Sequence, residues 1–206
     1  MKVDLWFPIL GTTLPSDHGY ALYGAVCHVV PQLHGADWWA LHTVRGIRTA
    51  PGSIALSRTP RLGIRLPGEH IPLLLPLAGR LLDVLGSRIR LGAPTIEGLS
   101  PHHALSARMV TIKPFVETQP FQAAVEKQVA ALGPFGAVEV GARKVLRVDG
   151  RRIVGFSVRV AGLDDASSLR LQEDGIGGRR HMGCGVFRRS VHELASDVRP
   201  VSEAAE

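Results

Sequence analysis

The sequence of 206 residues is poor in cysteine and contains no apolar run long enough to cross a membrane. Its two cysteines, Cys27 and Cys184, stand alone without CxxC spacing, so we expect neither a disulfide framework nor a zinc site. No other set of histidine, cysteine and acidic residues has metal-ligand spacing, so we expect no metal and no cofactor. The first residues lack the layout of a signal peptide, and we therefore expect a cytoplasmic protein without a membrane partner.

Lysine is also scarce, and arginine supplies most of the positive charge. Lysine occurs at only four positions, yet lysine and arginine together number 24 against 18 acidic residues, which gives a net charge of +6 and a pI near 10.0. An arginine-biased surface suits a polyanion such as nucleic acid, although the codon bias of a GC-rich genome explains part of the excess. Hydrophobic residues make up 45%, which is enough for one large domain or two small ones.

A glycine-rich stretch, residues 175–187, stands out near the C-terminus because it holds five glycines and two adjacent arginines. Glycine allows positive φ, and bare amides in such a loop can face an anionic phosphate, to which Arg179 and Arg180 would add charge. The following Gly183–Arg188 segment predicts a short strand. The alternative is a glycine-rich hairpin whose arginines are merely solvated.

Hydrophobic periodicity in the first half predicts the order strand, helix, strand, strand, helix, strand. Leu22, Val26 and Val30 form one apolar line of the first helix, and Pro31 should kink or end that helix. The expected strands are 3–10, 39–47, 61–66 and 88–96, and the second helix is 71–85. Residues 52–56 are expected to form either a short strand or one arm of a hairpin. This order matches a ferredoxin-like βαββαβ unit, whose open sheet face is free to bind a ligand.

The second half begins the same pattern again after a Gly/Ser/Pro/His boundary at 98–103. An Asp149-Gly150 turn predicts a hairpin, and the expected elements are strands 105–113, 138–146, 152–160 and 186–187 with helices 121–132 and 163–172. We therefore predict an α+β fold of two tandem ferredoxin-like (RRM-like) halves, the second less regular, ending in a glycine-rich loop. The predicted units are domains 1–99 and 100–192 and a disordered tail 193–206.

Three stretches in this order, 17–34, 107–113 and 175–187, make residues 1–190 resemble a known family. The resemblance is to the CRISPR-associated endoribonucleases of the RAMP superfamily that process precursor crRNA, most of all the small subgroup found with myxobacterial-type class 1 systems. It implies an RNA partner, namely CRISPR repeat RNA and crRNA, and a histidine at or just after the first helix. Some relatives grip an RNA hairpin with an arginine-rich second-half helix, whereas residues 118–132 carry only Lys127 as a base.

The chemistry implied by the resemblance is metal-independent cleavage, because RNA supplies its own nucleophile, the 2′-hydroxyl. Such cleavage needs a base, an acid and a positive charge near the phosphate, and histidine suits the first two roles. His34 is the first candidate, His42 the second and His18 the third; Tyr20 or Tyr23 would orient the phosphate and Lys113 would stabilise charge. The expected RNA-binding residues are Arg108, Lys113, Lys144, Gly175, Gly177, Gly178, Arg179, Arg180, His181, Gly183 and Gly185.

Two other functions remain open. The first is a non-catalytic RAMP subunit that binds crRNA within a class 1 effector complex, whose other subunits would then be partners. Fold alone does not separate this binder from the nuclease, but a histidine after the first helix favours the nuclease. The second is a generic RRM-like binder, which is disfavoured because the sequence has no aromatic RNP-type strand.

Overall fold

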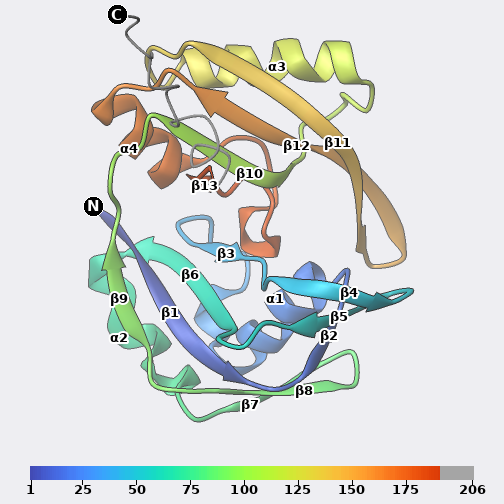
Figure 1. The fold of residues 1–206 in the computed structure, drawn as a ribbon. Coiled ribbons are helices and arrows are strands. Elements are labelled where there is room, and N and C mark those ends of the chain that lie inside the picture. Colours follow the sequence, from blue (N-terminus) through green and yellow to red (C-terminus); the bar gives the residue numbers. More distant parts are fainter. Residues whose placement is uncertain (191–206) are drawn as a thin grey trace, which may run out of the picture.

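Antiparallel β-sheets carry the α+β fold, and the computed structural model describes residues 1–190 of it (Figure 1). The α+β class predicted from the sequence is confirmed. In Figure 1 the N-terminal half, with β1 and α1, lies below, and the C-terminal half, with β10 to β13, lies above. The predicted disorder of 193–206 concerns residues outside the described part of the chain.

Strand β1 (Lys2–Leu10) is the organising strand of the N-terminal sheet, whose order is β3-β6-β1-β8-β7. Strand β9 also pairs with β1. It pairs with the first half of β1, at Val3–Trp6, whereas β8 pairs with the end of β1, at Ile9 and Leu10. All neighbouring strands of this sheet run antiparallel to each other. Besides β1 they are β3 (Ala40–His42), β6 (Arg61–Pro67), β7 (Leu81–Val84), β8 (Ser87–Leu91) and β9 (Thr95–Gly98). A separate small sheet has the order β2-β5-β4, from β2 (Thr13–Pro15), β5 (Ser53–Leu56) and β4 (Gly46–Ala50).

Helix α1 (Gly19–Val29) follows the predicted apolar line, with Leu22 and Val26 fully buried. Proline lacks the N–H that the next helical turn requires, so the chain changes at Pro31 into the short 3₁₀ turn η1 (Pro31–Leu33). His34 follows directly as the C-cap of that turn. The predicted end of the first helix at Pro31 is therefore confirmed.

The predicted helix 71–85 is wrong beyond its first turns. The chain forms only the 3₁₀ turn η2 (Gly68–His70), the single-turn helix α2 (Ile71–Leu74) and the 3₁₀ turn η3 (Leu75–Leu77) before strand β7 begins. Pro76 interrupts the helical hydrogen bonds, and Gly79 turns the chain with φ +77°. Leu81–Val84 then alternates between exposed and buried side chains, which is the period of a strand.

Two predicted strands are also divided by turns. The segment 39–47 becomes β3 and β4 in different sheets, and 88–96 becomes β8 and β9 on different parts of β1. Pro94 lies in the gap between β8 and β9, where a residue without an N–H suits a break between strands. The apolar runs were located correctly, whereas the breaks within them were not.

The C-terminal sheet has the order β11-β12-β10-β13 and is antiparallel throughout. The predicted Asp149-Gly150 hairpin is confirmed: both residues have positive φ, 49° and 72°, as a tight two-residue turn requires. The elements are β10 (Ala104–Val110), α3 (Thr118–Ala130), β11 (Ala137–Val148), β12 (Arg151–Ala161), α4 (Asp165–Asp174), the 3₁₀ turn η4 (Arg180–Met182) and β13 (Arg188–Arg189). The predicted strands at 183–188 and 186–187 are wrong, because regular pairing begins only at Arg188.

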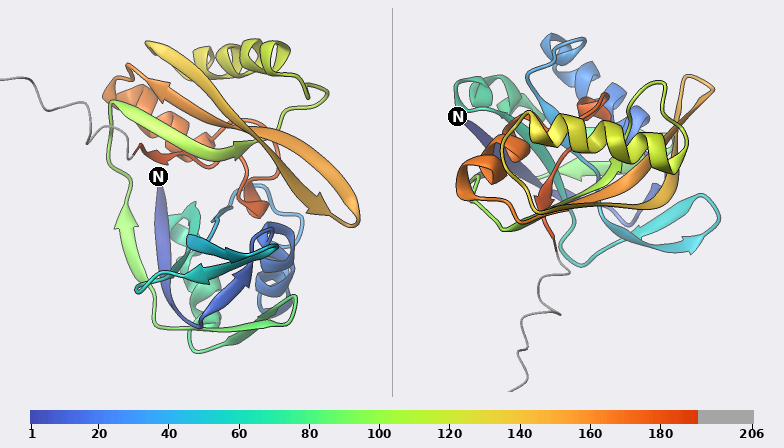
Figure 2. Two further views of the ribbon diagram at one scale, coloured as in Figure 1. Left: turned by 45° about the vertical axis from the view of Figure 1, so that its right-hand side comes forward. Right: turned by 90° about the horizontal axis from the view of Figure 1, so that it is seen from above.

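Two buried apolar clusters lie beneath these sheets. One is built around Phe121, Phe156 and Phe187 of the C-terminal half. The other fills the N-terminal half but also takes in four residues of the C-terminal half, Met109, Leu146, Met182 and Cys184. The left view in Figure 2 shows the β11–β12 hairpin reaching from its own half toward the N-terminal half. The halves are thus joined by shared apolar packing.

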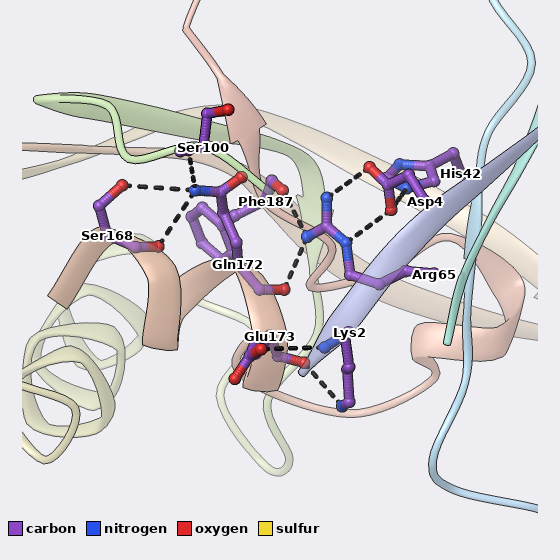
Figure 3. Close-up of polar contacts among 9 residues, drawn as sticks. All are labelled: Lys2, Asp4, His42, Arg65, Ser100, Ser168, Gln172, Glu173 and Phe187. Atoms are coloured by element: carbon purple, nitrogen blue, oxygen red, sulfur yellow. Dashed lines mark hydrogen bonds and ion pairs between the residues drawn. The ribbon is translucent and has the colours of Figure 1, made fainter. Parts of the chain in front are cut away.

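A buried polar network also links the halves (Figure 3). Arg65 of β6 donates through Nε and Nη2 to the two carboxylate oxygens of Asp4 on β1, both at 2.8 Å. Its Nη1 donates to the backbone carbonyls of Gln172 (2.6 Å) and Phe187 (2.9 Å) in the C-terminal half. Because Arg65 is only 2% exposed, these bonds are shielded from water and fix the end of the glycine-rich loop to the N-terminal sheet.

Candidate active site and basic groove

The glycine-rich loop, residues 175–187, packs closely against other backbone. A Cβ at Gly183, which has φ +84°, would collide with Thr43, and a Cβ at Gly185 would collide with the carbonyl of Ile176. Only glycine permits both the φ value and the close approach. The loop is therefore folded tightly onto β3 and onto itself.

The amides of all five loop glycines donate to groups of the protein. Gly177 donates to the side-chain oxygen of Gln128 (2.9 Å), and the other four donate to backbone carbonyls, with the donors Gly175, Gly178, Gly183 and Gly185. The expectation that these amides face a phosphate is therefore wrong. The loop's positive charge lies in the side chains of Arg179 and Arg180, the latter of which donates to the carbonyl of Asp174 (2.6 Å).

A cluster of four rings forms where the loop meets the end of α1, and we call it the histidine cluster: Tyr23, His34, Trp39 and His181. The ring of Tyr23 lies at its centre, 4.6 Å from His181, 6.0 Å from His34 and 5.9 Å from Trp39 between ring centroids. Tyr23 comes from α1, His34 from the turn after η1, Trp39 from the segment before β3, and His181 from η4. The structure thus brings the first-ranked histidine of the sequence beside a residue of the glycine-rich loop.

Two hydrogen bonds hold the segment that carries His34. The hydroxyl of Tyr23 accepts from the amide of Gly35 (3.4 Å), and the indole of Trp39 donates to the carbonyl of Leu33 (3.0 Å). His34 itself is exposed while both neighbours of its backbone are tied down. An exposed imidazole on a fixed backbone is suited to act on a ligand that arrives from solvent.

The electrostatics of the histidine cluster distinguish its members. Burial lowers the pKa of His181, and the charges of Arg179, Arg180 and His34 lower it further. Burial also raises the pKa of the Tyr23 hydroxyl. Both shifts favour the neutral forms, so the centre of the cluster contains an uncharged imidazole and an uncharged phenol at neutral pH.

His42 and His18 lie elsewhere and are buried. His42 is 3% exposed, bonds through Nε2 to Asp4 (2.9 Å) and stacks on Trp6 at 4.8 Å. Burial lowers the pKa of His42 to about 4, so the ring is neutral and donates to the carboxylate. Burial alone would raise the pKa of Asp4, but the hydrogen bonds from His42 and Arg65 outweigh it and lower that pKa.

His18 is 1% exposed at the start of α1 and joins two backbone segments. Its Nδ1 bonds to the carbonyl of Pro15 (2.8 Å), and its Nε2 accepts from the amide of Val44 (3.1 Å). Both ring nitrogens are thus occupied, which leaves none for a substrate. The other two candidates are exposed, with Tyr20 on the outside of α1 and Lys113 after β10, and neither belongs to the histidine cluster.

A basic groove runs between the halves on the other side of the glycine-rich loop. It consists of two neighbouring cavities, of about 610 and 310 Å³, that share Thr43, Arg108 and Gly183 in their walls. The positive side chains along it are Arg45, Arg48, Arg108, Arg143, Lys144, Arg159 and Arg188. The acidic residues along it are Asp17, in the smaller cavity, and Glu139. Glu139 is the acidic residue of the larger cavity, and it is already paired with Arg159 at 2.7 Å. The expected RNA-binding residues Arg108 and Lys144 therefore lie in a surface of strong positive charge.

Metal clusters and membrane-spanning helices are both absent from the described part of the chain. Among residues 1–190 no group of three or more histidine, cysteine or acidic side chains is placed to hold a metal ion. No helix within that range is long and apolar enough to span a membrane.

The sequence did not identify the ring contacts of Trp39 and His181 or the buried pairing of Asp4 with Arg65. Trp39 carried a usable signal, because it lies five residues after His34 at the entry to a strand. Asp4 and Arg65 also carried a usable signal, since each places a charge inside an apolar strand. A charge buried there is strongly destabilising unless an oppositely charged partner lies beside it.

Comparison with solved structures finds the same fold in other proteins. The chain is similar to a structure described as "CRISPR associated protein Cas6" (TM-score 0.67, 15% identity, covering 92% of this chain and 100% of the other). It is equally similar to a Cas6-related protein from Pyrococcus furiosus (TM-score 0.67, 14% identity, 91% and 98% covered). A third structure, described as a RAMP protein binding different RNA substrates, gives a TM-score of 0.64 at 14% identity, with 90% and 98% covered.

Comparison of sequences narrows this class to one family. The family described as Cas6 Crispr matches residues 3–190, and the chain belongs to the Cas6 family. A curated relative, the CRISPR-associated endonuclease Cas6 of Myxococcus xanthus (strain DK1622), is 41% identical over 186 residues, which is 90% of this chain and 80% of that protein. The resemblance noted in the sequence is confirmed, and so is the expectation of an enzyme, a CRISPR-associated endonuclease.

Proposed function

We propose that this chain cuts repeat RNA in precursor crRNA through attack of the RNA's own 2′-hydroxyl, leaving a 2′,3′-cyclic phosphate and a 5′-hydroxyl. The observation that carries the proposal is the histidine cluster, in which His34 lies beside Tyr23 and next to the glycine-rich loop. His34 supplies acid–base catalysis, and Tyr23, rather than the exposed Tyr20, orients the scissile phosphate. His42 and His18 serve the fold, because both rings are buried, Nε2 of His42 is bonded to Asp4, and both ring nitrogens of His18 are bonded to backbone groups.

The RNA is bound by arginine and lysine side chains on both sides of the glycine-rich loop. Arg179 and Arg180 lie beside His181 and extend positive charge toward the histidine cluster. Arg108 and Lys144 line the basic groove, and the exposed Lys113 adds a further positive charge after β10. Phosphate contacts of this kind position an RNA strand without reading its sequence.

The fold assignment behind this proposal is two tandem ferredoxin-like halves, 1–99 and 100–192. In the first half the order β3-β6-β1-β9 with α1 and α2 supports it, and in the second half the order β11-β12-β10-β13 with α3 and α4 does so. Each half also has its own buried apolar cluster. The two halves form the walls between which the RNA lies.

The proposal is tested by incubating the purified protein with repeat RNA from its own locus in EDTA. We expect cleavage to persist in EDTA and to disappear when the nucleotide 5′ of the cut carries a 2′-deoxy sugar, while binding stays nearly intact. The 5′-hydroxyl end should accept label from a polynucleotide kinase without phosphatase treatment. The 2′,3′-cyclic phosphate end should block labelling of the 3′ end both before and after treatment with alkaline phosphatase. Cleavage that EDTA abolishes and magnesium restores would contradict the mechanism.

His34 is tested separately by single-turnover cleavage. Positioned acid–base catalysis contributes about 10²–10⁴-fold, so His34→Ala should slow cleavage by that factor at nearly unchanged RNA affinity. The matched control is His28→Ala, another exposed histidine of the same region, on α1. Wild-type protein that binds repeat RNA tightly and never cuts it would favour the non-catalytic effector subunit instead.

A further inference from the structure

We propose that His181 of the glycine-rich loop is a second catalytic residue, which takes the proton of the 2′-hydroxyl while His34 gives a proton to the leaving 5′-oxygen. This inference rests on the proposed function and divides its acid–base work between two named histidines. The two rings come from opposite halves of the chain and face the same tyrosine ring, Tyr23.

The position of His181 is fixed by the backbone on both sides. It is the middle residue of η4, which is closed by hydrogen bonds from Met182 to the carbonyl of Arg179 (2.9 Å) and from Gly183 to that of Arg180 (3.0 Å). The turn is pressed against α1, where a Cβ on Gly19 would collide with the carbonyl of Met182. The turn that carries His181 is therefore fixed against α1, the helix that carries Tyr23.

The surroundings of His181 suit a proton acceptor. Its ring is half-buried, packs on Tyr23 and Trp39, and is close to the positive groups Arg179, Arg180 and His34. Each of these charges opposes a proton on His181, so the ring stays neutral and offers a nitrogen lone pair. Because the charge of His34 is among the causes that lower the pKa of His181, His181 is the member of the pair suited to be the base.

The two histidines exchange protons with the RNA in one balanced step. The neutral nitrogen of His181 takes the proton of the 2′-hydroxyl as the 2′-oxygen forms its bond to phosphorus. The bond from phosphorus to the 5′-oxygen breaks, and protonated His34 gives that oxygen its proton. The products are the 2′,3′-cyclic phosphate and the 5′-hydroxyl, and solvent returns each histidine to its starting state.

The experiment uses two repeat RNAs that differ at one atom. In the first the leaving atom is the natural 5′-oxygen, and in the second it is a bridging sulfur, which leaves readily without a proton. On the oxygen RNA we expect His34→Ala and His181→Ala each to slow single-turnover cleavage by about 10²–10⁴-fold. On the sulfur RNA we expect His34→Ala to cleave within a few-fold of wild type and His181→Ala to stay slow, with His28→Ala unchanged on both.

Damage to the loop is separated from loss of the base by free imidazole. Added imidazole should restore part of the His181→Ala rate on both RNAs, whereas it does nothing for a misfolded loop. Wild-type speed in His181→Ala, rescue of His181→Ala by sulfur, or failure of imidazole to restore any rate would each overturn the assignment. Wild-type protein that cuts neither RNA would instead refute the proposed function itself.

Discussion

Replacing Arg65 by leucine should destabilise the protein far more than any exposed arginine substitution does. The change removes four buried hydrogen bonds at once, two to the carboxylate of Asp4 and two to carbonyls of Gln172 and Phe187. Asp4 would keep only its bond to His42 and remain charged at 6% exposure. Removing one partner of a buried ion pair costs about 3–5 kcal/mol, and we expect a loss in that range.

The assay is urea unfolding followed by tryptophan fluorescence, with Arg88→Leu as the matched control. Arg88 is an exposed arginine on β8 of the same sheet, and a surface change of that kind costs roughly 0.5 kcal/mol or less. Arg65→Lys should fall between the two, because lysine keeps the charge but lacks the fork that holds both carboxylate oxygens. The slope of the unfolding curve shows whether the native state has changed its compactness.

The pH dependence provides an internal check on the same variant. The charge of Arg65 is one of the causes that keep the pKa of His42 low, so its removal lets that ring accept a proton and pair with Asp4. A variant that binds an extra proton when folded gains relative stability as the pH falls. The deficit of Arg65→Leu should therefore be smaller at pH 5 than at pH 8. A loss below about 1 kcal/mol at both pH values would refute the role of Arg65 as the link between the halves.

Three further outcomes are expected. Replacing Arg179 and Arg180 together by alanine should weaken RNA binding and make it less dependent on salt. In titrations at several salt concentrations, the slope of log affinity against log salt concentration should decrease in magnitude by roughly 0.7 for each phosphate that is no longer bound. Wild-type stability should fall as the pH drops from about 6.5 toward 4, because the lowered pKa of His42 means that the unfolded chain binds the proton first. The loss is on the order of 1–3 kcal/mol in urea unfolding. It should be smaller in His42→Gln, which keeps only the contributions of His18 and His181, whose pKa values burial also lowers. Gly183→Ala should cost about 1–3 kcal/mol in thermal unfolding, since its Cβ would meet Thr43 at a φ of +84°.

Periodicity predicted those elements whose apolar pattern was long and uninterrupted. Strand β1, helix α1 and the β11–β12 hairpin appear where the sequence indicated, because each has a clear period and a strong stop signal such as Pro31 or Asp149-Gly150. The helix predicted over 71–85 was wrong because its apolar residues fit two periods at once. Pairing of β7 with β8 decided between them, and β8 follows directly through a tight turn at Leu85 and Gly86, both with positive φ.

The ranking of the candidate site residues depended on contacts between segments that lie far apart in the sequence. His34 and the glycine-rich loop were identified from local features, and the structure brings them together around Tyr23. Ranking His42 and His18 among the catalysts overlooked their burial, which depends on strands that lie far along the chain. A single sequence gives residue types and spacing but not the partners that occupy a ring nitrogen.

The role of the loop glycines shows how one pattern supports two different physical explanations. Five glycines beside two arginines are typical of a backbone cradle for phosphate, yet here each of the five amides is bonded within the protein. The close approach of Gly183 to Thr43 and of Met182 to Gly19 instead lets the turn that carries His181 lie directly on α1. The close approach thus allows a side chain of the C-terminal half to reach the ring cluster of the N-terminal half, which is where the proposed role of His181 requires it to be. A larger residue at Gly19 or Gly183 should therefore reduce cleavage by more than it reduces RNA binding.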